Sequence, residues 1–146
     1  MYEQASLVQA LEVLGELLQA RGETHDLALI GGGALLLLGL IERPTKDLDV
    51  VARFQDQRLI RAEPLPLSLL TAVREVAEAL DLAEDWLNAG PAALVDFGLP
   101  EGFVDRLETR IYGGLTIRLA SRRDHVAFKL YAAVDQGPMS RHFADL

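Results

Sequence analysis

Two aspartates separated by a single residue, Asp47 and Asp49, are the side chains of this sequence best suited to chemistry. They stand at the head of a predicted β-strand over 47–53, where alternate residues face the same side, so both carboxylates project together. Two carboxylates this close repel one another unless a cation lies between them. Oxygen ligands of this kind suit Mg²⁺, which completes its shell with phosphate and water. The pair therefore predicts a site for Mg²⁺ or Mn²⁺.

Three consecutive glycines, Gly31, Gly32 and Gly33, precede the aspartates by thirteen residues and follow an apolar predicted strand over 27–30. Glycines at the start of a helix let backbone N–H groups approach a phosphate, and the helix N-terminus favours the negative charge. We expect residues 34–38 to form that short helix. A phosphate site next to a divalent-metal site indicates nucleotide chemistry.

The remaining patterns predict one α/β domain over residues 1–146. Leucines at helical spacing predict a first helix, and Gly22 would end it. Ser68 is a predicted N-cap, and Ser121 with Asp124 forms a predicted capping box. Gly113 and Gly114 favour a hairpin turn. The predicted elements are helices over 3–21, 69–80, 122–135 and 139–146, and hairpin strands over 109–112 and 115–119.

Composition excludes several classes of protein. The 146-residue chain has no cysteine, which excludes disulfide scaffolds, thiolate zinc sites and cysteine nucleophiles. A net charge of −8 argues against nonspecific wrapping of nucleic acid. The longest uncharged apolar run, 27–41, is shorter than the ~20 residues that a membrane span needs. We therefore expect a cytoplasmic protein with no membrane partner.

The glycine run, the short helix and the Asp-Leu-Asp motif together resemble the signature of the polymerase-beta-type nucleotidyltransferase superfamily. The form Arg43-x-Thr45-x-Asp47-x-Asp49 is similar to that of the AbiEii-like branch, which includes toxins of type IV toxin–antitoxin systems. The segment from Lys129 to Ala132, followed by Asp145-Leu146, is similar to another element of that branch. The resemblance implies a nucleotidyltransferase fold, a small mixed sheet flanked by helices, and transfer of a nucleoside monophosphate from an NTP.

The same resemblance implies roles for individual residues. Asp47 and Asp49 would hold the metal, the three glycines would bind the β- and γ-phosphates, and Lys129 and Asp145 would belong to the active site. Many superfamily members carry a third carboxylate on a later strand. The matching strand here, 115–119, carries Arg118 instead, so Asp96 is the candidate third ligand. The family also often continues beyond the equivalent of Leu146, so this chain would lack C-terminal helices that bind the acceptor.

Several other side chains have more than one interpretation. Lys129 interrupts an apolar helix, so it extends its ammonium group to solvent, pairs with a carboxylate such as Asp145, or contacts a phosphate. Arg43 and Lys46 either bind phosphate or acceptor RNA, or only balance the charge of the aspartates. Thr45 is a candidate phosphate-site residue and hydrogen-bond partner of Asp47. We interpret His125 as a polar residue at a helix start rather than a catalytic base. A cluster of arginines interleaved with acidic residues is more typical of a salt-bridged face than of an RNA-binding surface; its members are Arg106, Arg110, Arg118, Arg122 and Arg123.

The leading hypothesis is a toxin-like, metal-dependent nucleotidyltransferase whose acceptor is the 3′ end of tRNA, with a cognate antitoxin as partner. A second hypothesis keeps the NTP chemistry and moves the nucleotide to a protein or a small molecule. A third is an inactive nucleotide-binding or regulatory module. Replacing Asp47 or Asp49 with Asn would separate an enzyme from a binding module.

Overall fold

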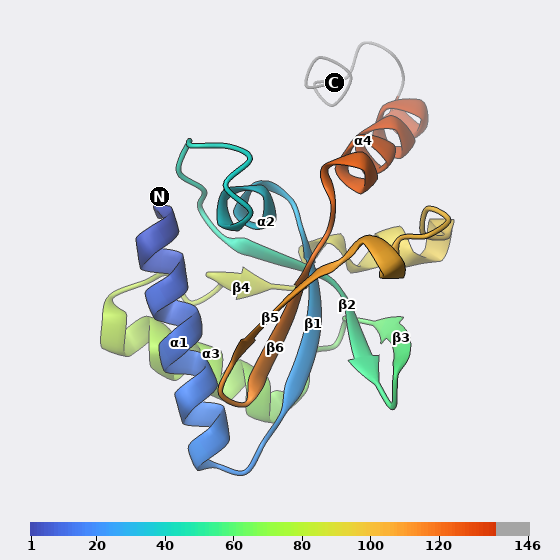
Figure 1. Cartoon of the computed structure of the whole chain (residues 1–146). Helices are drawn as coiled ribbons and strands as arrows, with labels where there is room; N and C mark the ends of the chain where they lie inside the picture. Colours follow the sequence, from blue (N-terminus) through green and yellow to red (C-terminus); the bar gives the residue numbers. More distant parts are fainter. Residues whose placement is uncertain (137–146) are drawn as a thin grey trace.

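A six-stranded mixed sheet organises the computed structural model, which describes residues 1–136 (Figure 1). The order of the main path is β3-β2-β1-β6-β5, and β4 pairs with β2. The strands are β1 (His25–Ile30), β2 (Leu48–Gln55), β3 (Arg58–Arg61), β4 (Leu87–Asn88), β5 (Glu108–Tyr112) and β6 (Leu115–Leu119). β1 runs antiparallel to β2 and parallel to β6, and β2 runs parallel to β4. This arrangement confirms the predicted mixed α/β fold.

Within residues 1–136 the other elements are four α-helices and two 3₁₀ segments: α1 (Gln4–Ala20), α2 (Gly32–Leu37), α3 (Leu67–Leu80), η1 (Gly90–Phe97), η2 (Val104–Arg106) and α4 (Arg122–Gln136). Helices α1 and α3 lie together against one face of the sheet, whereas α4 extends from the end of β6 away from them (Figure 1). None of the helices within residues 1–136 is long and apolar enough to cross a membrane.

The central strand β1 separates two cores because its side chains alternate between the faces of the sheet. Leu27 and Leu29 pack in the larger core with the apolar sides of α1 and α3. Ala28 and Ile30 pack in a smaller core that includes Phe128 of α4. Burial on both faces explains why this strand is a continuous apolar run. The same burial holds the end of β1 in place, and the glycine turn begins there.

Most predicted elements are confirmed within a few residues. The hairpin turn falls at Gly113 and Gly114, as expected, where the Gly114 amide donates a hydrogen bond to the carbonyl of Gly15 on α1 at 3.0 Å. The capping box is also confirmed, because the Ser121 hydroxyl accepts from the Asp124 amide at 3.2 Å. The helix predicted over 139–146 lies outside the described residues.

The start of α3 and the strand β3 correct the sequence analysis. Ser68 is not the N-cap, since α3 begins one residue earlier and Pro66 occupies the cap position. β3 was not predicted. It pairs with β2 across a turn in which Asp56 and Gln57 both have positive φ, of 52° and 65°. Such turns favour Asn-Gly or Asp-Gly, so Asp-Gln carries little turn signal.

Candidate active site

The two carboxylates lie where β2 begins, at the edge of the sheet that β4 extends. Leu48 is fully buried, while Asp47 and Asp49 on either side of it are half-buried. β4 runs beside this segment, so Asp49 pairs with Asn88 in the strand register. The Asn88 side-chain amide donates to Asp47 Oδ2 at 3.3 Å and to the Asp85 carbonyl at 3.1 Å. Asn88 therefore helps to position the carboxylate pair.

The electrostatics of the pair match those of a cation site. Burial, together with the nearby Asp47 carboxylate, raises the pKa of Asp49 to about 6, against the opposing effect of Lys46. A raised carboxyl pKa means that the ionised form is disfavoured until a positive charge arrives. Among the described residues no group of three acidic or histidine side chains is placed to hold a metal ion. The structure thus presents a two-carboxylate site.

The glycine turn lies directly against this pair. Gly31 has a φ of 89°, and a Cβ built on it would stand 2.8 Å from Asp49 Oδ2. A Cβ on Gly33 would stand 2.8 Å from the Asp47 carbonyl oxygen, so Gly33 allows α2 to pack on the start of β2. Gly32 faces Thr45, whose hydroxyl donates to the Asp47 carbonyl at 3.3 Å. The predicted contact of Thr45 with Asp47 is therefore made to the backbone.

His125 joins α4 to the glycine turn, a role that the sequence analysis missed. Its Nε2 accepts the Gly31 amide hydrogen at 2.7 Å, and its Nδ1 lies 2.9 Å from the Ser121 carbonyl. A carbonyl only accepts, so Nδ1 carries the proton and the ring is neutral. Burial accordingly lowers the pKa of His125. The Gly31 amide, expected to meet a phosphate, is therefore occupied by His125 in this state.

Replacing His125 with Phe is expected to lower the free energy of unfolding at neutral pH by about 1–3 kcal/mol, because the Gly31 amide loses its acceptor. The pKa of His125 is lower in the folded protein than its ordinary value of 6.5. Its contribution to stability is therefore complete above pH 6.5 and is lost as the pH falls below 6.5. The difference between the two proteins should therefore shrink in acid. Urea unfolding of both proteins at several pH values measures this difference, and His25, which is present in both, contributes equally. A difference that stays constant with pH would contradict the hydrogen bond assigned to neutral His125.

A small pocket beside the turn has only cationic side chains among its charged lining residues. Its volume is about 230 Å³, and Arg43, Arg122 and Lys129 line it together with His125. Apolar side chains of Leu35, Leu40, Ile41 and Val126 complete it. A pocket without a carboxylate is notable in a chain of net charge −8. His125 contacts Gly31, and Gly31 lies against Asp49, so these two residues link the pocket to the carboxylate pair.

The structure brings together some of the predicted residues and separates others. Lys129 and Arg43 share the cationic pocket, whereas Lys46 is exposed and acts on Asp49 through its charge. Asp96 does not join the pair as a third ligand. It lies exposed on η1, where its Oδ2 pairs with Arg61 Nη1 of β3 at 2.7 Å. Asp145 lies outside the described residues.

Arg122 is the member of the arginine cluster for which the sequence interpretation was incomplete. Arg106, Arg110 and Arg118 form ion pairs, with Asp124, Glu108 and Asp26 respectively. These salt bridges are as expected, but Arg110 and Arg118 project from opposite faces of the sheet and so do not form one salt-bridged face. Arg122 instead lines the cationic pocket, and its position seven residues, about two turns, before Lys129 on α4 was the available signal.

A mixed sheet that carries neighbouring carboxylates at a strand start, beside a glycine turn, is consistent with a nucleotidyltransferase fold. Residues 5–137 match the family model described as "Nucleotidyltransferase of unknown function (DUF6036)", and the chain belongs to this family. No curated protein and no solved structure matches the chain. The family supports the predicted nucleotidyltransferase class and carries no assignment to the AbiEii-like branch.

Proposed function

We propose that this protein transfers a nucleoside monophosphate from an NTP to a hydroxyl acceptor, with a divalent cation at Asp47 and Asp49. The observation that carries the proposal is that two opposite charge environments are linked through Gly31 and His125. The carboxylate pair suits a metal ion, and the pocket of Arg43, Arg122 and Lys129 suits a triphosphate. Family membership supports the same class of reaction.

In the proposed reaction the acceptor hydroxyl oxygen attacks the α-phosphorus of the NTP. The new oxygen–phosphorus bond forms as the bond from the α-phosphorus to the bridging oxygen breaks. Pyrophosphate leaves with the electron pair, and the hydroxyl proton passes to solvent. Arg43, Arg122 and Lys129 bind the β- and γ-phosphates and stabilise the charge that develops on the leaving group.

The residues at the pair fit a divalent cation. Two half-buried carboxylates oppose each other, and burial with mutual repulsion raises the pKa of Asp49 to about 6. Mg²⁺ or Mn²⁺ would neutralise this repulsion and the charge on the reacting phosphate. Asn88 holds the Asp47 carboxylate through its amide, which leaves that oxygen's remaining lone pairs for the cation.

The test is a transfer assay with each of the four α-labelled NTPs and Mg²⁺ or Mn²⁺. Acceptors are total tRNA, cell protein and cell metabolites in separate reactions, and pyrophosphate release is measured in parallel. We expect label on one acceptor class, and its loss in Asp47→Asn. If the protein binds NTP with Mg²⁺ yet labels nothing and releases no pyrophosphate, it is a binding module and the proposed activity is refuted.

The acceptor and the biological setting are separate predictions. Transfer to the 3′ end of tRNA, a toxin role and a cognate antitoxin rest on the resemblance to the AbiEii-like branch. Label that appears on tRNA, together with growth arrest on expression, would support them. Label on another acceptor class would leave the nucleotidyltransferase proposal in place and remove the toxin-like one.

A further inference from the structure

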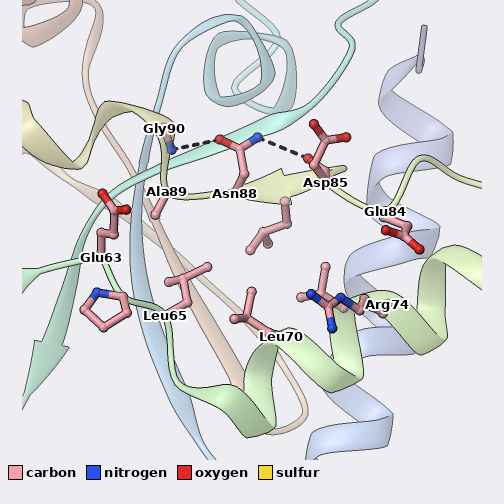
Figure 2. Close-up of a pocket in the computed structure, with 12 residues that line it drawn as sticks. Glu63, Leu65, Leu70, Arg74, Glu84, Asp85, Asn88, Ala89 and Gly90 are labelled. Atoms are coloured by element: carbon pink, nitrogen blue, oxygen red, sulfur yellow. Dashed lines mark hydrogen bonds between the residues drawn. The ribbon is translucent and has the colours of Figure 1, made fainter.

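A second, larger hollow shares no lining residue with the cationic pocket. It has a volume of about 710 Å³ and lies between the start of α3 and the strand β4 (Figure 2). Leu65 and Leu70 lie along one side of it, and Asn88 and Ala89 along the other (Figure 2). Val73 and Leu87 add further buried apolar surface. The volume falls within the range typical of small-molecule sites, and the lining combines apolar side chains with charged and polar ones.

Asn88 connects this cavity to the reacting centre. It lines the cavity, and its amide contacts Asp47 at 3.3 Å. Its side-chain oxygen accepts the Gly90 amide at 2.9 Å, which fixes the orientation of the group. A molecule in the cavity therefore lies next to a carboxylate that we place at the metal. That is the position an acceptor hydroxyl needs for attack on the α-phosphorus.

The charge of the cavity is opposite to that of the triphosphate pocket. Glu63, Glu84 and Asp85 line it together with a single guanidinium, Arg74. None of these four side chains forms an ion pair with another described residue, whereas Arg21 and Glu75 nearby pair with each other. Their charges therefore act on whatever enters. A polyanion such as RNA is disfavoured here, and a cation is attracted.

We propose that this cavity binds the acceptor, and that the acceptor is a small organic cation: a hydroxyl-bearing amine with an apolar portion. The proposal rests on the proposed nucleotidyl transfer and names the substrate class of that site. The apolar portion packs on the leucines, the ammonium group faces the carboxylates at the rim, and the hydroxyl reaches the pair past Asn88. The nucleoside of the NTP is uncharged at neutral pH, so unpaired carboxylates give it no comparable attraction.

The test measures binding without requiring turnover. The probes are hydroxyl-bearing primary amines, each paired with its uncharged N-acetyl counterpart. Methyl NMR signals of Leu65, Leu70 and Leu87 report on the cavity of the wild-type protein. We expect the amines to shift these signals and the N-acetyl forms to leave them unchanged. The double variant Glu84→Gln/Asp85→Asn should weaken amine binding by about 3- to 10-fold, because each exposed ion pair contributes little.

The matched control is Glu12→Gln/Glu16→Gln, which makes the same change in net charge on the exposed side of α1 and should bind amines as the wild type does. Equal binding of amines and N-acetyl forms would overturn the proposal, as would shifts of these signals by an NTP alone or no shift by any amine. The NMR signals of Arg43 and Lys129 report separately on NTP binding, which tests the proposed function. A protein that binds amines but no NTP would refute the proposed function and leave a cation-binding cavity.

Discussion

Replacing Asp49 with Asn should reduce the rate of nucleotidyl transfer by about 10³-fold, because the proposed metal site would lose one of its two carboxylates. The same change should make the metal-free protein more stable at neutral pH. The pKa of the buried carboxyl is raised from 3.8 to about 6, so ionising it opposes folding. Allowing for its partial exposure to solvent, we expect a rise in Tm of about 2–4 °C.

The pH dependence makes this expectation specific. The pKa of the Asp49 carboxyl is higher in the folded protein than in the unfolded chain. The carboxyl therefore stabilises the fold fully below pH 3.8 and loses that contribution as the pH rises toward 6. The stability gain of Asp49→Asn should therefore grow across this interval and level off above it. Calorimetry in chelator measures it. Asp56→Asn, in the turn at the far end of β2, is the control and should change neither Tm nor transfer. An Asp49→Asn protein that is less stable than the wild type in chelator would contradict the buried-repulsion account.

Replacing Gly31 with Ala should reduce transfer by about 10²-fold through displacement of Asp49. Gly31 has a φ of 89° and a ψ of −171°, a conformation essentially restricted to glycine, so any side chain strains the turn. The added Cβ would also approach Asp49 Oδ2 at 2.8 Å, and the carboxylate would have to rotate away from the pair. Single-turnover rates and the midpoint of urea unfolding are the measurements, with a loss of about 1–3 kcal/mol expected in stability.

Gly32→Ala is the matched control within the same turn. Its Cβ would meet only Thr45, with Oγ1 at 3.3 Å, and its φ is not in the left-handed region. We expect transfer to fall by less than about threefold, since only a side-chain hydroxyl must move. If the two variants lost activity equally, the turn would act through its general flexibility rather than through contact with Asp49.

The parts of the fold that were predictable depend on neighbours in sequence. The β5–β6 hairpin follows from Gly113 and Gly114, and the start of α4 follows from Ser121 and Asp124. Alternation around Leu48 placed both aspartates on one side of a strand. These signals involve only residues close together in the sequence, so they can be recognised without knowing the tertiary structure.

The contacts that complete the site were not predictable because they join distant segments. Asn88 reaches Asp47 across 41 positions, through the pairing of a two-residue strand that has no periodicity to detect. His125 reaches Gly31 across 94 positions, through the way α4 packs against the end of β1. A polar residue in the first turn of an apolar helix is compatible with solvent exposure as well as with burial. Only the packed structure distinguishes these outcomes.

The first turns of α4 hold to the rest of the molecule through three contacts of different kinds. Asp124 pairs with Arg106, and His125 accepts a hydrogen bond from the Gly31 amide. The Phe128 ring packs edge-on against the Phe103 ring, with their centroids 5.8 Å apart. Since Lys129 lies on the same helix, displacing α4 would remove a cation that we propose binds the phosphates, and would release the glycine turn with it. Nucleotide binding and the docking of α4 are then thermodynamically coupled, so each makes the other more favourable. Amide hydrogen exchange in α4 would accordingly slow when a nucleotide binds, even where no nucleotide atom touches the helix.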